Sequence, residues 1–394
     1  MAGTGSLPVR ARDVVAVTLP PGPDWARVTA AVWEVGAALL PLDHRLPEHQ
    51  TRSVIERARP TIQRTREGWS RRNDGVGADD DVSLVIATSG TAGAPKLVEF
   101  ERAAVEAAVW GSVGALGAGP RDPWLSCLPL AHVGGLLVVL RGIMLGAPLT
   151  VLPNFDIGRF AAAGCRFTSI VPTMLVRLLD GAVDLAGFRG ILVGAGGMPP
   201  DLRARASAAG APVVQTYGLT ESCGGIVYDG RPFAGVQLRI HPETSAIELF
   251  GPTAMRGYRF DERGTAEAFT SDGWLRTADA GRLERDGTLH VLGRLDDLVK
   301  TGGERVWPEE VEAALRGHPK VADVAVAGRP DPEWGQRVVA FVVPVDPAEP
   351  PTLEELRDHA AGTLPSYGLP REIVLVPGPL PRSASGKIRR AALR

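Results

Sequence analysis

The sequence predicts an α/β protein: a large N-terminal domain of layered, largely parallel sheets with helices and a small β-rich subdomain, followed by a small α+β C-terminal domain. Three observations support this class. Strand-like and helical apolar patterns alternate through residues 102–215, as in doubly covered parallel sheets. After Gly225 the chain changes to short strands with Gly and Asp-Gly turns. At 394 residues it also exceeds the usual size of a single core, so two domains are expected.

The first hundred residues lead up to the alternating region. A strand is expected at 14–17, a helix at 24–39 and a second helix at 47–58. Residues 60–81 are rich in Arg, Gly and Asp without periodicity, which predicts a surface connection. In the alternating region, helices are expected at 102–113, 134–145, 157–163, 173–179 and 200–208, with strands at 124–128, 149–152, 167–170, 190–193 and 213–215.

The last third of the chain contains short strands and then a compact α+β segment. The short strands are expected at 236–240, 246–249, 274–276, 282–284 and 288–292, and the segment adds helices at 308–315 and 353–362 and strands at 321–327, 337–343 and 373–376. We place the domain boundary at 292–297. Residues 1–293 then form the N-terminal domain and residues 294–394 the C-terminal domain.

Composition favours small-molecule chemistry. A formal charge of −2 and 44% hydrophobic residues give no basic excess for nucleic acid and no polybasic tail for membranes. Three widely spaced cysteines argue against disulfides or a zinc site and fit a reducing cytoplasm. No apolar run has the length of a signal peptide core or a membrane span. The sequence leaves a homodimer open.

A loop at 88–96 has the composition of a phosphate cradle between two strands. Its glycines can expose backbone N–H groups, its hydroxyls add donors, and its lysine adds a compact positive charge. These groups are Thr88, Ser89, Gly90, Thr91, Gly93 and Lys96. The loop lacks the spacing of the ordinary P-loop, and many Gly/Ser/Thr loops bind nothing, so other stretches must decide between these readings.

Three further stretches supply groups suited to a nucleotide. Gly194-Ala195-Gly196 and Tyr217-Gly218-Leu219-Thr220-Glu221 each follow an apolar strand, where ligands of such sheets bind. A glycine loop admits a flat ring, a tyrosine can stack on it, and a carboxylate beside phosphates can hold Mg²⁺. Asp279 could accept two hydroxyl hydrogen bonds from a ribose. Each also has a structural reading: Tyr217 as core, Glu221 as a solvated turn residue and Asp279 as a turn aspartate.

Taken in order, these stretches resemble the adenylate-forming superfamily of acyl- and aryl-CoA ligases, luciferases and nonribosomal-peptide adenylation domains. The resemblance runs from about Val14 to Arg394. Besides the stretches above it rests on Leu128-Pro129-Leu130-Ala131-His132, Val171-Pro172-Thr173-Met174, Gly293-Arg294-Leu295-Asp296-Asp297 and Arg382-Ser383-Ala384-Ser385-Gly386-Lys387.

The resemblance implies a two-step reaction with ATP, Mg²⁺ and CoA. A carboxylate attacks the α-phosphorus of ATP, pyrophosphate leaves, and a thiol then displaces AMP from the acyl-adenylate. The family roles assign β- and γ-phosphates to Lys96 and its loop, Mg²⁺ to Glu221 with Thr220, adenine to Gly194–Gly196, Tyr217 and Gly218, and ribose to Asp279 and Arg294.

The same resemblance gives the C-terminal domain a mobile role. Lys387 would reach the α-phosphate and carboxylate oxygens during adenylation. Asp296 matches the family's hinge position, about which the small domain rotates between the two half-reactions. The segment containing Lys300, Gly302 and Gly303 would then line the path of the thiol.

A short loop after Glu221 and the run from His132 to Arg141 look like the o-succinylbenzoate-CoA ligases of menaquinone biosynthesis. That acid keeps a second carboxylate, which needs a cationic partner if buried. Arg141 is the candidate partner, with His132 and Ser222 near the acyl group, unless Arg141 merely extends to solvent. The alternatives are another small aryl or medium-chain acyl-CoA ligase, or a stand-alone enzyme that loads a carrier protein.

Overall fold

The computed structural model describes residues 8–88, 95–382 and 388–393. The chain divides into two compact units, one made of Met1–Leu238 and Leu249–Leu275 and the other of Arg239–Glu248 and Arg276–Arg394. The predicted boundary between residues 293 and 294 stays a prediction, because a division into compact units does not test where one domain would move against another.

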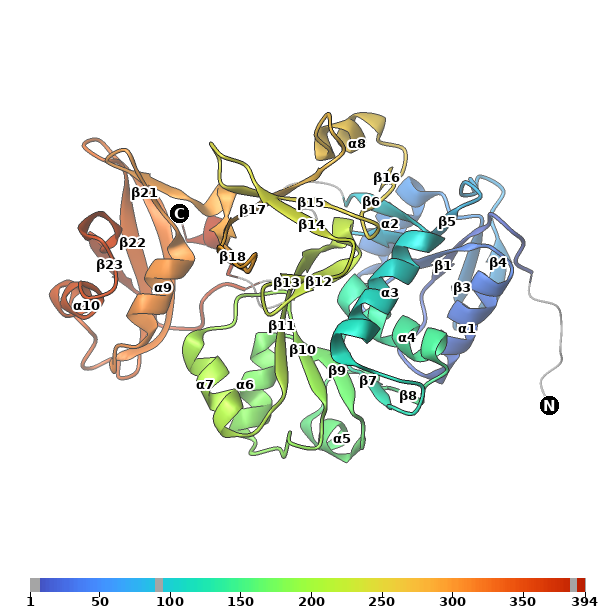
Figure 1. Ribbon diagram of the computed structural model, residues 1–394, viewed down its shortest axis with the longest axis horizontal. Coiled ribbons are helices and arrows are strands. Elements are labelled where there is room, and N and C mark those ends of the chain that lie inside the picture. The colour runs from blue at the N-terminus through green and yellow to red at the C-terminus, as the bar shows by residue number, and fades with distance from the viewer. Residues whose placement is uncertain (1–7, 89–94, 383–387, 394) are drawn as a thin grey trace. The chain divides into compact units, whose positions relative to one another are not determined.

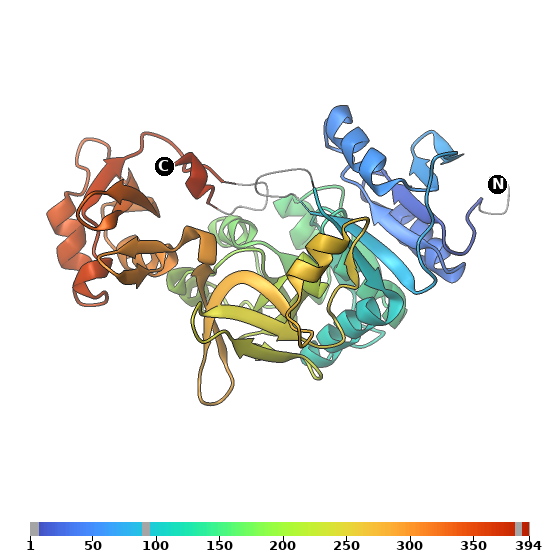
Figure 2. The same ribbon diagram turned by 90° about the horizontal axis from the view of Figure 1, so that it is seen from above.

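The first sheet of the first unit combines a parallel centre with antiparallel edges. Its order is β16-β6-β5-β2-β1-β3-β4, and β5, β2, β1 and β3 are parallel neighbours. Helix α1 packs against β2, and the blue N-terminal helices lie beside their sheet in Figures 1 and 2. The elements are β1 Val14–Val17, α1 Pro23–Glu34, β2 Ala38–Pro41, α2 Glu48–Ala58, β3 Ile62–Thr65, β4 Gly68–Arg71, β5 Val82–Ala87, β6 Leu97–Glu101 and β16 Gly257–Tyr258.

Two expectations for this region were wrong. The helix expected at 24–39 ends at Glu34, because Gly36 adopts a left-handed φ of 72° and a buried strand begins at Ala38. The stretch at 60–81 is more than a surface connection, since it contains β3 and β4. Ile62 is fully buried and pairs with Val15 in parallel register.

The second sheet confirms the expected alternation of strands and helices. Its order is β13-β12-β11-β10-β9-β7-β8. The neighbours from β11 to β8 pair in parallel, whereas β12 pairs antiparallel with both β11 and β13. The elements are α3 Arg102–Leu116, β7 Trp124–Ser126, α4 Val133–Leu145, β8 Leu149–Val151, α5 Ile157–Ala162, β9 Phe167–Ile170, α6 Pro172–Asp180, β10 Gly190–Val193, α7 Pro200–Ala208, β11 Val213–Leu219, the 3₁₀ turn η1 Thr220–Ser222, β12 Gly224–Tyr228 and β13 Arg231–Pro232.

A four-stranded sheet, β14-β15-β17-β18, follows. The strands expected separately at 274–276 and 282–284 form one nine-residue strand, β17, so the aspartate between them lies in a strand instead of a turn. The sequence patterns also missed β12, β13, β16 and a short helix, α8. The elements are β14 Gln237–Ile240, β15 Ala246–Phe250, α8 Glu262–Ala268, β17 Leu275–Leu283, β18 Leu289–Arg294 and the 3₁₀ turn η2 Leu295–Asp297.

The remainder of the second unit is a small α+β fold, as expected. Strands β20, β19, β22 and β21 form a sheet in that order, β23 adds to β22 in parallel, and α9 and α10 pack together beside it (Figure 1). Its core consists mainly of valines and leucines. The elements are β19 Val299–Thr301, β20 Glu304–Val306, α9 Pro308–Arg316, β21 Val321–Asp331, β22 Gly335–Pro344, α10 Leu353–Ala360, η3 Ser366–Gly368, β23 Glu372–Leu375 and η4 Arg390–Ala392.

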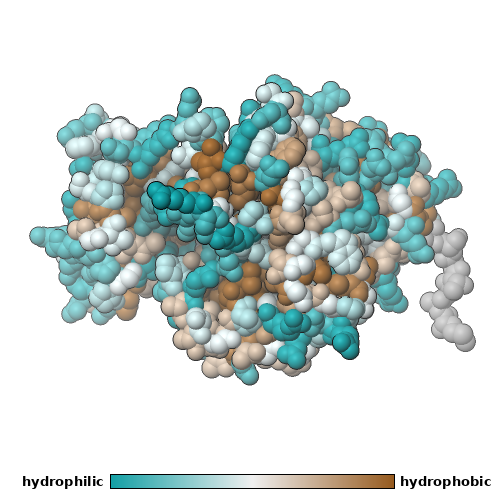
Figure 3. Space-filling model, in the orientation of Figure 1, coloured by the Kyte–Doolittle hydropathy of each residue, from teal (hydrophilic) through white to brown (hydrophobic). Residues whose placement is uncertain are grey.

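Hydrophilic side chains cover much of the face shown in Figure 3, and apolar residues appear there in separate groups between them. Within residues 8–88, 95–382 and 388–393, none of the helices has both the length and the apolar character that crossing a bilayer requires.

Two adjacent glycines of α4 should differ in what they tolerate. A Cβ at Gly135 would lie 2.4 Å from the Pro129 carbonyl oxygen, whereas a Cβ at Gly134 would have an ordinary 3.9 Å contact with Leu128. We expect Gly135→Ala to lower the free energy of unfolding by about 1–3 kcal/mol through overpacking. Gly134→Ala should leave it unchanged or raise it by up to about 1 kcal/mol through helix propensity. Denaturant unfolding measures both, and equal effects would contradict the packing described here.

Candidate active site

The phosphate-loop candidate lies, as expected, between two strands, which pair antiparallel as β5 and β6. At its base, the Thr88 backbone N–H donates to the Lys96 carbonyl oxygen at 2.8 Å. Lys96 is exposed and directly precedes β6. Ser89, Gly90, Thr91 and Gly93 lie outside the described residues, so their part in the cradle stays a prediction.

Tyr258 joins this lysine to the predicted metal-binding carboxylate. The Lys96 ammonium lies 4.3 Å from the centroid of the Tyr258 ring, and the Tyr258 hydroxyl donates to Glu221 Oε1 at 2.9 Å. Burial, followed by the nearby Glu221 charge, raises the pKa of Tyr258, so the phenol stays protonated and keeps donating. Sequence reasoning missed Tyr258. The only available signal was that it is one of four tyrosines and falls between Gly-rich stretches.

Glu221 and Thr220 form the 3₁₀ turn directly after β11. This places the carboxylate where the sheet argument expects ligands, and the backbone carbonyl of Glu221 accepts from Met255 N–H at 2.8 Å. Mg²⁺ in nucleotide enzymes is usually held by one or two carboxylates together with substrate phosphates. One carboxylate beside a hydroxyl fits that pattern. The described residues contain no group of three or more His, Cys, Asp or Glu side chains that would hold a metal unaided.

The two predicted adenine-framing stretches adjoin neighbouring strands. Gly194 directly follows β10, and Tyr217 and Gly218 lie within the longer β11 instead of after a strand end. Backbone space is tight: a Cβ on Gly194 would lie 2.4 Å from Thr216 Oγ1, and one on Gly218 would lie 1.9 Å from the Gly224 carbonyl oxygen. Close packing of the backbone therefore requires glycine at both positions. The binding of a flat ring beside them stays a prediction.

His132 is the residue preceding α4, in the segment that follows β7. Its ring is exposed, yet nearby protein atoms desolvate it enough to lower its pKa, and the charge of Arg45 adds to the lowering while that of Asp43 opposes it. Arg45 donates to Asp43 through Nε at 2.9 Å and Nη2 at 2.6 Å. The segment after β2 thus brings two charges near the predicted acyl-site histidine, a proximity that no sequence motif signalled.

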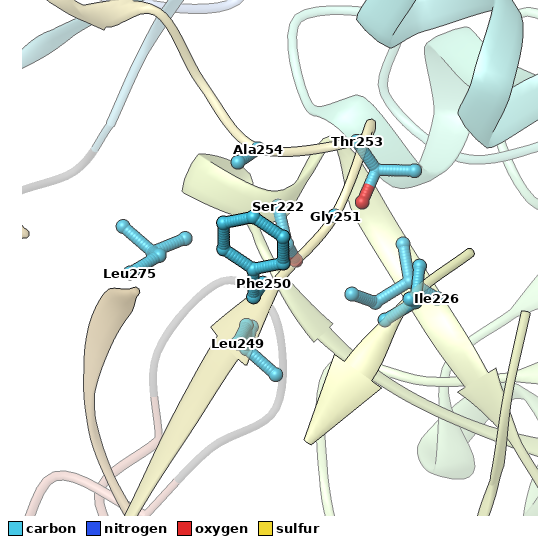
Figure 4. Close-up of a pocket in the computed structure, with 9 residues that line it drawn as sticks. Ser222, Ile226, Leu249, Phe250, Gly251, Thr253, Ala254 and Leu275 are labelled. Atoms are coloured by element: carbon cyan, nitrogen blue, oxygen red, sulfur yellow. The ribbon is translucent and has the colours of Figure 1, made fainter. Parts of the chain in front are cut away.

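Ser222 is buried, and its hydroxyl bonds to the backbone. It accepts from Leu219 N–H at 3.0 Å and donates toward the carbonyl oxygens of Leu219 and Gly224 at 3.1 and 3.0 Å. Figure 4 shows Ser222 beside a small cavity lined by Leu249, Phe250 and Leu275, among others. Its volume is about 10 Å³, room for one water. An acyl group does not fit there, so contact between Ser222 and the acid stays a prediction.

Arg141 does not extend to solvent: it is 2% exposed. Its guanidinium lies 5.5 Å from the Trp124 ring centroid, and Nη2 donates to the Tyr228 hydroxyl at 3.4 Å, which in turn bonds Ser112 at 2.7 Å. Nε and Nη1 have no hydrogen-bond partner among the described residues. Burial without a carboxylate partner lowers the pKa of Arg141. The contact between Arg141 and a substrate carboxylate therefore stays a prediction, consistent with its two unsatisfied donors.

The second unit carries the predicted ribose groups. Asp279 and Arg294 sit opposite each other in β17 and β18, and Arg294 Nη1 donates to Asp279 Oδ1 at 3.1 Å. The Asp279 backbone N–H donates to Thr277 Oγ1 at 3.1 Å. Asp279 therefore lies in a strand and not in a turn, and Arg294 orients its carboxylate. Contact with a ribose stays a prediction.

The residues predicted for the hinge and for the path of the thiol lie between η2 and β20. Asp296 is exposed within η2, and Lys300 is exposed in β19. Gly302 and Gly303 form the turn between β19 and β20 with left-handed φ angles of 58° and 86°. Lys387 lies outside the described residues. Hinge, thiol and adenylation roles therefore stay predictions.

A larger groove of about 530 Å³ lies elsewhere in the first unit, along β16 and α8. Both of its arginines are paired with carboxylates, Arg256 with Asp79 at 2.6 Å and Arg259 with Glu99 at 2.7 Å. None of the predicted site residues lines it, although Tyr258 forms part of its wall.

Two parts of the chain match models of known protein families. Residues 61–247 match the family model described as AMP-binding enzyme, and residues 310–387 match the model described as AMP-binding enzyme C-terminal domain.

The chain is also similar to individual proteins of known name. The chain is 42% identical over 329 residues to a probable 2-succinylbenzoate–CoA ligase of Mycobacterium tuberculosis, covering 80% of this chain and 84% of the relative. It is 31% identical over 434 residues to a 2-succinylbenzoate–CoA ligase of Bacillus cytotoxicus, covering 98% and 89%. An o-succinylbenzoate CoA synthetase of Bacillus subtilis, solved with its acyl-adenylate intermediate, superposes with a TM-score of 0.84 at 27% identity, covering 98% of this chain and 89% of that one.

The lowered pKa of His132 makes a prediction about pH. Desolvation by nearby protein atoms disfavours the imidazolium, so the pKa of His132 in the folded chain lies below the ordinary 6.5. Between these two pKa values the unfolded chain binds more protons than the folded chain. The contribution of His132 to the free energy of unfolding should therefore be complete above about pH 6.5 and be lost as the pH falls through the folded pKa. An NMR titration should place its midpoint below 6.5, and lower still in Asp43→Asn. His132→Gln identifies the signal; a midpoint at or above 6.5 contradicts the prediction.

Proposed function

The chain belongs to the AMP-binding enzyme family, and from this premise we propose that it is an AMP-forming acid–thiol ligase. In the first step a carboxylate oxygen bonds to the α-phosphorus of ATP and the bond to pyrophosphate breaks. In the second, the sulfur of CoA bonds to the acyl carbon, the bond to AMP breaks, and the thiol proton is released. The single observation that supports this best is the contact series Lys96–Tyr258–Glu221 beside the phosphate loop.

Each predicted residue would contact a different part of the nucleotide. Lys96 would steady the departing pyrophosphate, while Lys387 would compensate charge that builds on the α-phosphate and the attacking carboxylate. Glu221, held by Tyr258 and flanked by Thr220, would help bind the Mg²⁺ that ATP carries, which neutralises phosphate charge. Gly194–Gly196, Tyr217 and Gly218 would frame adenine. Asp279 and Arg294 would hold the ribose hydroxyls.

We further propose o-succinylbenzoate as the acid. Relatives at 42% and 31% identity carry that substrate in their names. The buried Arg141 supplies an independent argument, because an apolar monocarboxylic acid would leave its guanidinium uncompensated while the second carboxylate of o-succinylbenzoate would pair with it. His132 would lie near the acyl group in this arrangement. This substrate would place the enzyme in menaquinone biosynthesis. A cytoplasmic location and a homodimer stay predictions.

The alternatives differ in the acid or in the thiol. Another small aryl or medium-chain acyl-CoA ligase would use the same nucleotide groups with a different acid. A stand-alone loading enzyme would deliver the acyl group to phosphopantetheine on a carrier protein instead of CoA.

Pyrophosphate release across a panel of carboxylic acids tests the substrate. With ATP, Mg²⁺ and CoA present, we expect kcat/KM for o-succinylbenzoate to exceed that for benzoate, hexanoate and octanoate by at least about a hundredfold, since an unpaired buried charge costs several kcal/mol. A flat profile, or a preference for an apolar acid, would overturn the assigned substrate and leave the reaction class standing.

Replacing Arg141 tests the source of this preference. Arg141→Met keeps an unbranched, largely apolar side chain but removes the cation, so KM for o-succinylbenzoate should rise about tenfold or more while KM for benzoate changes little or falls. Arg159→Met, an exposed arginine of α5, is the matched control and should leave both constants unchanged. An unchanged ratio of the two KM values in Arg141→Met would assign this arginine a purely structural role.

A further inference from the structure

The stretch that contains Lys387 is bounded by two fixed points in the second unit. Arg382 and Ile388 pair as an isolated antiparallel bridge, and Arg389 N–H donates to the Pro381 carbonyl oxygen at 2.8 Å. On the N-terminal side, Arg382 Nη2 donates to both carboxylate oxygens of Asp323, at 3.0 and 2.7 Å. The residues flanking the lysine are therefore attached to the body of the unit.

On the C-terminal side the fixed point is Arg390, three residues after Lys387. It is 7% exposed, and its guanidinium contacts three separate elements. Nη2 donates to Glu312 Oε1 at 2.7 Å and lies 3.0 Å from Glu309 Oε1, both on α9. Nη1 donates to Asp297 Oδ2 at 3.3 Å in η2, and Nε donates to the Val326 carbonyl oxygen at 3.0 Å in β21.

The partners of this guanidinium are themselves held in place. Glu312 is 5% exposed and its Oε1 also accepts from Val326 N–H at 2.8 Å. Glu309 lies against Gly293, where any Cβ would come within 2.2 Å of Glu309 Oε2. Three carboxylates thus surround one cation, and burial raises the pKa of Glu309 to about 7. A planar fork with five donors suits these directions, whereas a lysine ammonium presents one point charge.

We propose that Arg390 is a positioning residue for adenylation: it anchors the described residues that follow Lys387 to α9 and to η2, the turn that contains the predicted hinge residue Asp296. This rests on the proposed function, in which Lys387 acts in the first half-reaction. Displacing a reacting charge by about 1 Å can cost on the order of a hundredfold in rate, so loosening the anchor should be felt at Lys387 without any direct contact between Arg390 and substrate.

Arg390→Lys tests the proposal by separating the half-reactions. The rate of acyl-AMP formation should fall about tenfold or more, while thioester formation from supplied acyl-AMP and CoA should change less than about twofold. Glu312→Gln, which keeps an acceptor for Val326, should show a smaller loss in the same direction. Arg389→Lys, the exposed neighbour, is the matched control and should change neither rate.

The outcomes are distinguishable. Equal loss in both half-reactions, or no loss in either, would overturn the positioning role, and thermal unfolding of each variant shows whether the second unit remains folded. Lys387→Ala separates this inference from its premise. If Lys387→Ala spares adenylation, the proposed function of Lys387 fails; if it abolishes adenylation while Arg390→Lys does not, only the role of Arg390 fails.

Discussion

Parallel pairing of β7, β9, β10 and β11 is the constraint on which the candidate site depends. The register sets Val193 beside Ile170 and Ile191 beside Val213, so the segments that leave these strands emerge along one edge of the sheet. That edge brings together the glycine loop after Gly194 and the turn with Glu221, which are 27 positions apart. The carboxylate of Glu221 and the glycine loop owe their positions to this shared edge, as in other sheets of this class.

Groups that lie next to a strand end could be predicted from the sequence, because their position needs only the local element and the rule for parallel sheets. The phosphate loop, Gly194 and Glu221 are such cases. Tyr258 could not, since its contact with Glu221 spans 37 positions and depends on β16 joining the edge of the first sheet. The missed strands β3 and β4 have the same explanation: tertiary pairing of Ile62 with Val15 overrides a polar, Gly-rich local pattern.

Two buried arginines show how context decides the meaning of a charge. Arg390 is surrounded by three carboxylates and serves the architecture of its own unit. Arg141 has a tyrosine hydroxyl and an indole face but no carboxylate among its described contacts, and its burial excludes the alternative reading in which it extends to solvent. Burial of a charge costs free energy unless an opposite charge compensates it. The carboxylates around Arg390 provide that compensation, whereas the described contacts of Arg141 include none. Of these two arginines, only Arg141 is therefore proposed to bind a ligand.

The central claim, an acyl-adenylate intermediate, is tested most directly by isotope transfer. The acid, labelled with ¹⁸O in both oxygens of the reacting carboxylate, is turned over with ATP, Mg²⁺ and CoA, and the nucleotide product is analysed by mass spectrometry. Attack of the carboxylate oxygen on the α-phosphorus predicts AMP that carries one ¹⁸O, with none in pyrophosphate. Label in inorganic phosphate together with formation of ADP, or unlabelled AMP, would contradict the account.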